Sequence, residues 1–228
     1  MHTIDFKRKP TKSGYMGAGL KVLIAASGGS ITPYLCGISG GTVGMMFSLD
    51  TPIYKTYDFM PYAIDNGKYQ AVIKNKPWDE TAFFEMIEKI KDHGTRPEFV
   101  VVPDVPFDAE ATRQEFRKYA PQLERLGWPL AFAAQDGMTA ADIPDGYVAF
   151  LGGTRKFKTQ FMQHCEGSRV HVGRVNRFKH LKEFDLAGAS SVDGSGYLRE
   201  GWGGKNLEQL LMYQRWVEHG RTPEAVLF

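Results

Sequence analysis

Cysteine is scarce in this chain: Cys36 and Cys165 are the only two among 228 residues. Two thiols so far apart in sequence cannot build a disulfide framework or a cysteine-rich zinc site. We therefore expect two free thiols, buried or half-buried, as is typical of a protein from the reducing cytoplasm.

Long apolar runs are also missing. No run approaches the roughly 18 residues that a membrane helix needs, and residues 1–12 carry charges where a signal peptide would be apolar. With 43% hydrophobic and 24% charged residues, the composition is that of a globular protein with no membrane partner. The length suits one domain with a large core, over residues 1–228.

The chain has almost no excess of one charge over the other, because its net charge is only +2. The basic residues, however, are unevenly distributed along the sequence. Between residues 155 and 182 the chain has one acid, Glu166, and eight basic residues: Arg155, Lys156, Lys158, Arg169, Arg174, Arg177, Lys179 and Lys182. A second basic cluster lies in residues 1–20, which we interpret as a basic N-terminal extension. Clustered basic residues bind phosphate backbones; the alternative is a solvated helix face.

Apolar runs with strand character alternate with helical patterns. We expect strands at residues 21–27, 60–65, 97–104, 129–135, 147–151, 170–175 and 188–193. A further run, 41–49, is expected to pair with the first strand as a hairpin. Helices are predicted after Asp79, from about Asp108, and over 205–219.

The end of the chain repeats an earlier pattern. Residues 93–102 and 219–228 both read as a helix end, a glycine, a Pro-led turn and an apolar strand. Counting 224–228 as the eighth strand predicts a closed α/β barrel of the TIM type, a (β/α)8 fold in a single domain. An open doubly wound sheet is the alternative. The chain has neither a G-x-G-x-x-G fingerprint leading into a helix nor a P-loop.

Polar residues stand where the predicted strands end. Asp65, Asp104 and Asp193 each end an apolar run, Gln135 ends another, and the pair Gly152-Gly153 ends a fifth. In a parallel barrel these ends converge on one face, so we expect the residues to share one pocket. Three acids and an amide suit the recognition of a polar heterocycle and attack on a bond beside it.

The order of these motifs resembles that of the tRNA-guanine transglycosylase superfamily, TIM barrels that exchange a guanine for a 7-deazaguanine. The motifs are Ala-Ile-Asp-Asn-Gly-Lys-Tyr (63–69), Val-Val-Pro-Asp-Val-Pro (101–106), Ala-Ala-Gln-Asp-Gly (133–137), Phe-Leu-Gly-Gly-Thr (150–154) and Ser-Ser-Val-Asp-Gly-Ser (190–195). Ile31-Thr-Pro-Tyr is similar to a segment near the start of that family's barrel, so the resemblance covers residues 31–193. The short length is most similar to the phage and bacterial 7-deazaguanine DNA transglycosylases.

The resemblance implies a role for each residue. Asp193 corresponds to the nucleophile that attacks C1′ and forms a covalent glycosyl intermediate, and Asp65 corresponds to the general acid/base. Asp104 corresponds to the acid that accepts hydrogen bonds from guanine N1–H and the exocyclic amine. Gln135 and the backbone amides of the Gly152-Gly153 pair would donate to the purine O6. Read without the family, the same aspartates and glycines are ordinary turn residues.

Two further groups complete the expected site. Tyr69 and Met138 are candidates for stacking on the base, with core packing as the alternative for both. The basic residues Arg155, Lys156, Lys158, Arg174 and Arg177 would hold phosphates around an extruded nucleotide.

The chain also departs from the tRNA enzymes. Those carry a zinc site of three cysteines and a histidine after the nucleophile strand, whereas both cysteines here precede Asp193. The family's first motif usually reads Asp-Ser-Gly-Gly-Phe, and here Lys68 replaces the second glycine. A zinc subdomain is therefore not expected.

Together these features predict a zinc-free enzyme that replaces guanine in DNA with a 7-deazaguanine derivative. It would need no organic cofactor, because the free deazapurine base is the co-substrate, and it could act as a homodimer in the cytoplasm, that of the host if phage-encoded. Three alternatives stay open: a tRNA-guanine transglycosylase, a non-catalytic nucleic-acid-binding barrel, and a TIM-barrel lyase or isomerase. The last would act on a small phosphorylated substrate held by Gly152-Gly153 and Gly173.

Overall fold

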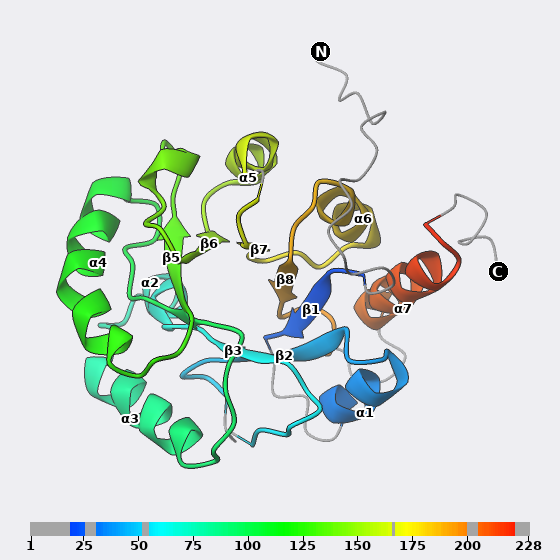
Figure 1. Cartoon of the computed structure of the whole chain (residues 1–228), viewed down its shortest axis with the longest axis horizontal. Helices are drawn as coiled ribbons and strands as arrows, with labels where there is room; N and C mark the ends of the chain where they lie inside the picture. Colours follow the sequence, from blue (N-terminus) through cyan, green and yellow to red (C-terminus); the bar gives the residue numbers. More distant parts are fainter. Residues whose placement is uncertain (1–18, 26–30, 52–54, 166, 200–204, 222–228) are drawn as a thin grey trace.

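Eight parallel strands close into a barrel. The computed structural model describes residues 19–25, 31–51, 55–165, 167–199 and 205–221, and its strands follow one another around the ring in chain order (Figure 1). Each strand pairs in parallel with the next, and the last pairs with the first. The predicted α/β barrel is confirmed, and closure excludes the open doubly wound sheet.

The strands are short. They are β1 (Lys21–Ile24), β2 (Val43–Phe47), β3 (Tyr62–Ile64), β4 (Val100–Val101), β5 (Leu130–Ala134), β6 (Val148–Leu151), β7 (Val170–Val172) and β8 (Ser191–Gly194). Nearly all of their residues are buried. Strands covered on both faces need apolar side chains on both, which explains why they read as unbroken apolar runs.

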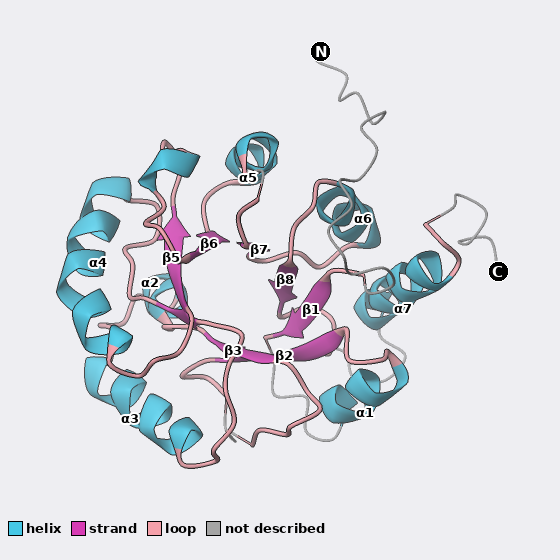
Figure 2. Ribbon diagram, viewed as in Figure 1, coloured by secondary structure: helices cyan, strands magenta, loops and turns pink. Residues whose placement is uncertain are grey.

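Helices surround the strands (Figure 2). They are α1 (Ile31–Ile38), α2 (Lys68–Ile73), α3 (Glu80–Lys91), α4 (Ala109–Glu124), α5 (Arg155–Phe161), α6 (Phe178–Leu186) and α7 (Lys205–Glu218), with 3₁₀ turns at Ala140–Asp142 and Met162–His164. The predicted caps are confirmed: the side chain of Asp79 accepts a hydrogen bond from Ala82 N, and that of Asp108 from Ala111 N, both at 2.9 Å.

The barrel interior holds a cluster of its own, separate from the two clusters between strands and helices. Its buried members are Leu23, Met46, Ala63, Phe99, Val101, Ala131, Ala133 and Val148. Leu23 on β1 is in register with Asp193 on β8, so the side chains of both point inward. The apolar side chains inside the barrel therefore lie next to the polar residues at the carboxyl ends of the strands.

The hairpin prediction for residues 41–49 is wrong. β2 pairs in parallel with β1, and helix α1 lies between them. Pro33 is tolerated in this helix, because a proline in the first turn of a helix removes no helical hydrogen bond. Because β2 is a barrel strand, β8 already completes eight, and the predicted strand at 224–228 is not needed for closure. That segment and the N-terminal extension up to residue 18 lie outside the described residues.

We predict that Gly44→Ala strongly destabilises the barrel. A Cβ at Gly44 would lie 2.0 Å from the carbonyl oxygen of Pro61, so β2 and β3 would have to separate. We expect a fall of about 3 kcal/mol in the free energy of unfolding, measured by urea denaturation. The control is Gly37→Ala in helix α1, where an added Cβ meets nothing within 4 Å. An equal loss in both variants would contradict the explanation.

Candidate functional site

Asp104 is the centre of a network at the carboxyl ends of β3, β4 and β5. Its two carboxylate oxygens accept hydrogen bonds from side-chain amides: Oδ1 from Asn66 Nδ2 at 2.8 Å and Oδ2 from Gln135 Nε2 at 2.7 Å. Asn66 also donates to the carbonyl oxygen of Val102 at 3.1 Å. All three side chains are buried, so the network holds the carboxylate in one orientation.

Asp104 and Asp193 lie close enough to Asp65 for their charges to affect its ionisation. Burial, and after it the charges of Asp193 and Asp104, raise the pKa of Asp65 to about 7, although backbone N–H groups of Gly67 and Asn66 oppose the shift. Burial also raises the pKa of Asp104 to about 6, against the hydrogen bond from Asn66 and the charge of Lys68. A carboxyl group that titrates near neutral pH can both donate and accept a proton there.

Asp193 is held from the β7 side. Its Oδ1 lies 3.0 Å from His171 Nε2 and also accepts a hydrogen bond from the backbone N–H of Arg174 at 3.3 Å. The other ring nitrogen of His171, Nδ1, lies 2.8 Å from Ser191 Oγ. The imidazole is fully buried, stacked on the ring of Phe150 at a centroid distance of 4.9 Å. Both of these contacts engage the same carboxylate oxygen, Oδ1.

The sequence reasoning did not select Asn66, His171 or Ser191. A signal for two of them was present: Ser191 is two residues before Asp193 on the same strand and therefore shares its inward face. His171 lies in the strand predicted at 170–175. A single histidine in an apolar strand gives no indication of its partner, and the partner becomes visible only in the register of β7 and β8.

Arg174 crosses the end of the barrel. Its guanidinium donates to the carbonyl oxygens of Gly152 at 3.0 Å and Gly153 at 2.7 Å, and lies over the ring of Tyr69 at 4.4 Å. The edge of Tyr69 faces Phe107, with ring centroids 6.0 Å apart. Tyr69 follows β3 and Arg174 follows β7, strands on opposite sides of an eight-membered ring. This contact therefore covers the strand ends, and Asp104 and Asp193 are each only 8% exposed.

The glycine pair differs from its expected role. The N–H of Gly152 donates to the carbonyl oxygen of Ala134 at 3.0 Å, so this amide is engaged within the sheet. At Gly153 a Cβ would lie 2.4 Å from Asp136 Oδ2, which explains why a glycine is required there. Met138 is buried, and its sulfur accepts a hydrogen bond from Gln135 N at 3.3 Å.

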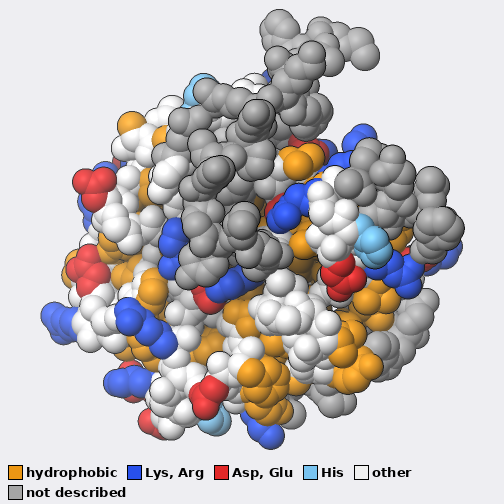
Figure 3. Space-filling view, turned by 45° about the vertical axis from the view of Figure 1, so that its right-hand side comes forward, with side chains coloured by type: hydrophobic (Ala, Val, Ile, Leu, Met, Phe, Trp, Pro, Cys, Tyr) orange, Lys and Arg blue, Asp and Glu red, His pale blue; other side chains and the backbone are white. Residues whose placement is uncertain are grey.

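The five basic candidates lie in two environments. Arg155, Lys156, Arg174 and Arg177 are exposed on or beside α5 and α6, with Arg155 paired to Glu183. Lys158 is buried and donates to the carbonyl oxygen of Gly173 at 2.6 Å. Its burial, together with the charge of Arg174, lowers the pKa of this lysine to about 8. On the part of the surface visible in Figure 3, Lys and Arg side chains are scattered among other types and form no continuous positive area.

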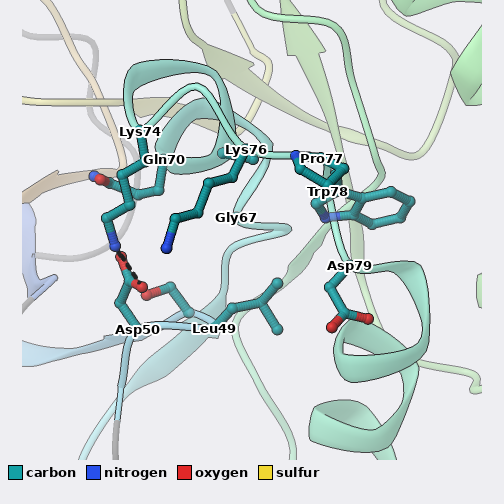
Figure 4. A pocket seen from close by; sticks show the side chains of 11 residues that line it. Leu49, Asp50, Gly67, Gln70, Lys74, Lys76, Pro77, Trp78 and Asp79 are labelled. Carbon is teal, nitrogen blue, oxygen red and sulfur yellow. Dashed lines mark hydrogen bonds and ion pairs between the residues drawn. The ribbon is translucent and has the colours of Figure 1, made fainter.

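Lys68, which departs from the motif of the family that the sequence resembles, is paired with Glu115. Its ammonium lies 2.5 Å from Glu115 on α4 and 4.4 Å from the centre of the Trp78 ring. On the same outer side of α2 there is a small pocket, where Lys74 forms an ion pair with Asp50 (Figure 4). Its described lining residues include none of the expected site residues.

The structure also bears on the thiols, on metal-binding groups and on membrane-spanning helices. Cys36 and Cys165 are both free and buried, as predicted. Within the described ranges, no group of three or more His, Cys, Asp or Glu side chains is placed to hold a metal ion. Among the described helices, none has the length and apolarity to cross a membrane.

Comparison with known proteins identifies the fold and no family. No family model matches the chain, and no curated protein matches it. A chain in the crystal structure of the Amycolatopsis orientalis BexX/CysO complex is similar, with a TM-score of 0.51 and 12% identity over 92% of this chain and 93% of that one. At this identity the likeness extends to the barrel alone.

We predict that Asp65 makes the protein less stable as the pH rises from about 4, where an aspartate titrates in an unfolded chain, to about 7, its pKa in the fold. In this window the folded protein keeps a proton that the unfolded chain has released, so the free energy of unfolding falls with rising pH. Asp65→Asn removes this contribution. The free energy of unfolding of the variant minus that of the wild type should therefore rise with pH between about 4 and 7 and stay constant above pH 7. Urea denaturation at several pH values measures the difference.

Asp145→Asn, which removes an exposed carboxylate, is the control for this measurement. A stability difference between Asp65→Asn and the wild type that does not change with pH would contradict the elevated pKa.

Proposed function

We propose that this protein is a base-exchange glycosyltransferase that replaces guanine in DNA with a 7-deazaguanine derivative through a covalent aspartyl–glycosyl intermediate. The observation that carries the proposal is the electrostatic coupling of Asp65 with Asp193. Burial, followed by the charges of Asp193 and Asp104, raises the pKa of Asp65 to about 7, and Oδ1 of Asp193 is engaged by His171 and the backbone N–H of Arg174. A proton-transfer group next to an oriented carboxylate is the combination that retaining glycosyl transfer uses.

In the first half-reaction Asp193 Oδ2 attacks C1′ of the target nucleotide. The C1′–N9 bond breaks, its electron pair goes to the guanine, and protonated Asp65 gives its proton to the leaving base. In the second half-reaction, ionised Asp65 takes the N9 proton of the incoming deazapurine. N9 then attacks C1′, the C1′–Oδ2 bond breaks, and the carboxylate of Asp193 is restored. One glycosidic bond replaces another, so the free base is the only co-substrate.

Asp104 is suited to read the guanine edge. A carboxylate has about four lone-pair positions, and here the amides of Asn66 and Gln135 use two of them. The remaining positions match the two donors of guanine, N1–H and the exocyclic amine. In this proposal Gln135 has two functions: one hydrogen of its amide nitrogen is donated to Asp104, and the other would be donated to the purine O6. Of the glycine pair, Gly153 is the member whose amide we assign to O6.

A base must displace Arg174 to stack on Tyr69. The guanidinium occupies the face of that ring, so we propose that the base takes its place and that Arg174 turns to a phosphate. Arg155, Lys156 and Arg177 would contact neighbouring phosphates. Lys158 is left out of this set because it is buried and bonded to Gly173.

The decisive prediction concerns exchange of radiolabelled guanine. We expect label to enter DNA and not bulk tRNA, and Asp193→Ala to lower the rate by about 10,000-fold or more. Asp65→Asn keeps the size of the side chain but removes proton transfer, which should cost about 100-fold. A denaturing gel after reaction with DNA should show a covalent adduct with the wild type and none with Asp193→Ala.

Other results would select another function. Label in tRNA would identify a tRNA enzyme. Tight DNA binding with no exchange, unchanged by Asp193→Ala, would identify a binding protein, and neither binding nor exchange would favour a lyase or isomerase on a small substrate.

A second prediction tests the stacking position. Tyr69→Ala should raise the KM for free guanine by about 10- to 100-fold, since stacking on an aromatic ring contributes about 1–3 kcal/mol per base. Tyr69→Phe keeps the ring and should leave KM within about twofold of the wild type, by the same reasoning. Steady-state exchange with varied guanine measures both, and equal KM values in the two variants would exclude stacking on this ring.

A further inference from the structure

His171 is a polar group in an otherwise apolar interior. It lies between the stacked ring of Phe150 and the edge of Phe99, each with its centroid 4.9 Å away, and has no exposure to solvent. A buried imidazole needs a partner for each nitrogen, and here each nitrogen has one. The two partners, Ser191 and Asp193, are next-but-one neighbours on the same strand.

The chemistry of the partners determines where the protons are. An ionised carboxylate only accepts, so Nε2 of His171 must carry a proton and donate it to Asp193 Oδ1. In the neutral ring Nδ1 then accepts, and the hydroxyl of Ser191 donates to it. The chain of donors therefore runs from Ser191 through His171 to Asp193. The donors follow the same order as in a Ser-His-Asp triad, with the two ring nitrogens exchanged, but Ser191 lies deeper in the barrel than Asp193 on the same strand.

We propose that His171, oriented by Ser191, is a positioning residue for the nucleophile Asp193. This inference rests on the proposed function. Its N–H holds Oδ1 so that Oδ2 faces C1′ in the first half-reaction. Once Oδ2 is bonded to C1′, Oδ1 is the carbonyl oxygen of the ester. The same N–H then stabilises the negative charge that returns to Asp193 when the incoming base attacks C1′ and the C1′–Oδ2 bond breaks.

The two half-reactions should therefore respond differently to loss of this N–H. In the first half-reaction the hydrogen bond orients the carboxylate of Asp193. It is strongest before the attack, when this carboxylate carries its full negative charge. In the second, charge develops on the carboxylate in the transition state, so the hydrogen bond lowers the barrier. Removing the donor should slow breakdown of the intermediate more than its formation, and a purely structural role would not produce this asymmetry.

The test compares His171→Phe with His171→Gln. Phenylalanine keeps a flat ring against Phe150 but has no donor, and we expect kcat for exchange to fall about 100-fold. The KM for DNA should fall with it, because breakdown of the adduct becomes rate-limiting while kcat/KM for DNA, which reports adduct formation, changes little. The covalent adduct should accumulate at steady state. Glutamine places an N–H near the position of Nε2 and should recover most of the rate. Phe150→Leu is the matched control, because it disturbs packing around the ring but leaves both hydrogen bonds.

Thermal unfolding of each variant separates lost rate from lost fold, and Ser191→Ala gives a second variant with a smaller change in the core. We expect Ser191→Ala to lower kcat in the same direction as His171→Phe. Normal exchange by folded His171→Phe would overturn the proposal, as would a rate loss in Phe150→Leu equal to that in His171→Phe.

A readout without substrate separates this proposal from the proposed function. Nitrogen NMR of protein labelled at histidine should show the His171 ring protonated at Nε2, with Nδ1 an acceptor. Asp193→Asn should shift the Nε2–H resonance. A ring protonated at Nδ1 alone would overturn the positioning role even in an active enzyme. Absence of exchange into any nucleic acid, with the ring protonated at Nε2 as expected, would overturn the function and with it the assigned role.

Discussion

The electrostatic repulsion that Asp104 and Asp193 exert on the carboxyl group of Asp65 is the constraint on which the candidate site depends. Asp65, Asp104 and Asp193 stand at the ends of different strands, and barrel closure brings these ends to one face, where Asp104 and Asp193 are buried. The three differ in their hydrogen-bond partners: Asp104 is bonded by two amides, Asp193 by an imidazole and a backbone N–H, and Asp65 by backbone N–H groups alone. Groups with the same side chain thereby acquire different chemical abilities from their surroundings.

This arrangement also explains the polar residues nearby that would otherwise be unexpected in an apolar core. Asn66, Gln135 and His171 are buried, and each contacts one of the acids. Burying amides and an imidazole has a cost in desolvation, which the hydrogen bonds to carboxylates offset. A carboxylate cluster at a strand end therefore requires a second set of polar residues behind it.

The fold and the acid cluster could be predicted from the sequence, because both follow from local patterns. Apolar runs of β-branched residues, capping aspartates and polar strand ends each identify an element without knowledge of its neighbours. The hairpin assigned to residues 41–49 failed because α1 is short and contains Pro33 and Gly37, so its residues resemble a turn. The His171–Asp193 contact could not be predicted, since it depends on the relative register of β7 and β8. Nor does a list of basic residues indicate that Lys158 is buried while Arg155 is exposed.

Arg174 makes separate contacts at the end of the barrel with its backbone and with its side chain. It adopts a left-handed backbone conformation with φ of 59°, which is costly for a residue with a side chain. In this conformation its N–H points inward to Asp193, while its guanidinium lies across the strand ends on Gly152, Gly153 and Tyr69. The side chain can therefore swing aside about its own χ angles while the N–H keeps its place on the carboxylate. One residue therefore contacts Asp193 through its backbone and Tyr69 through its side chain, and a movement of the side chain need not disturb the backbone contact.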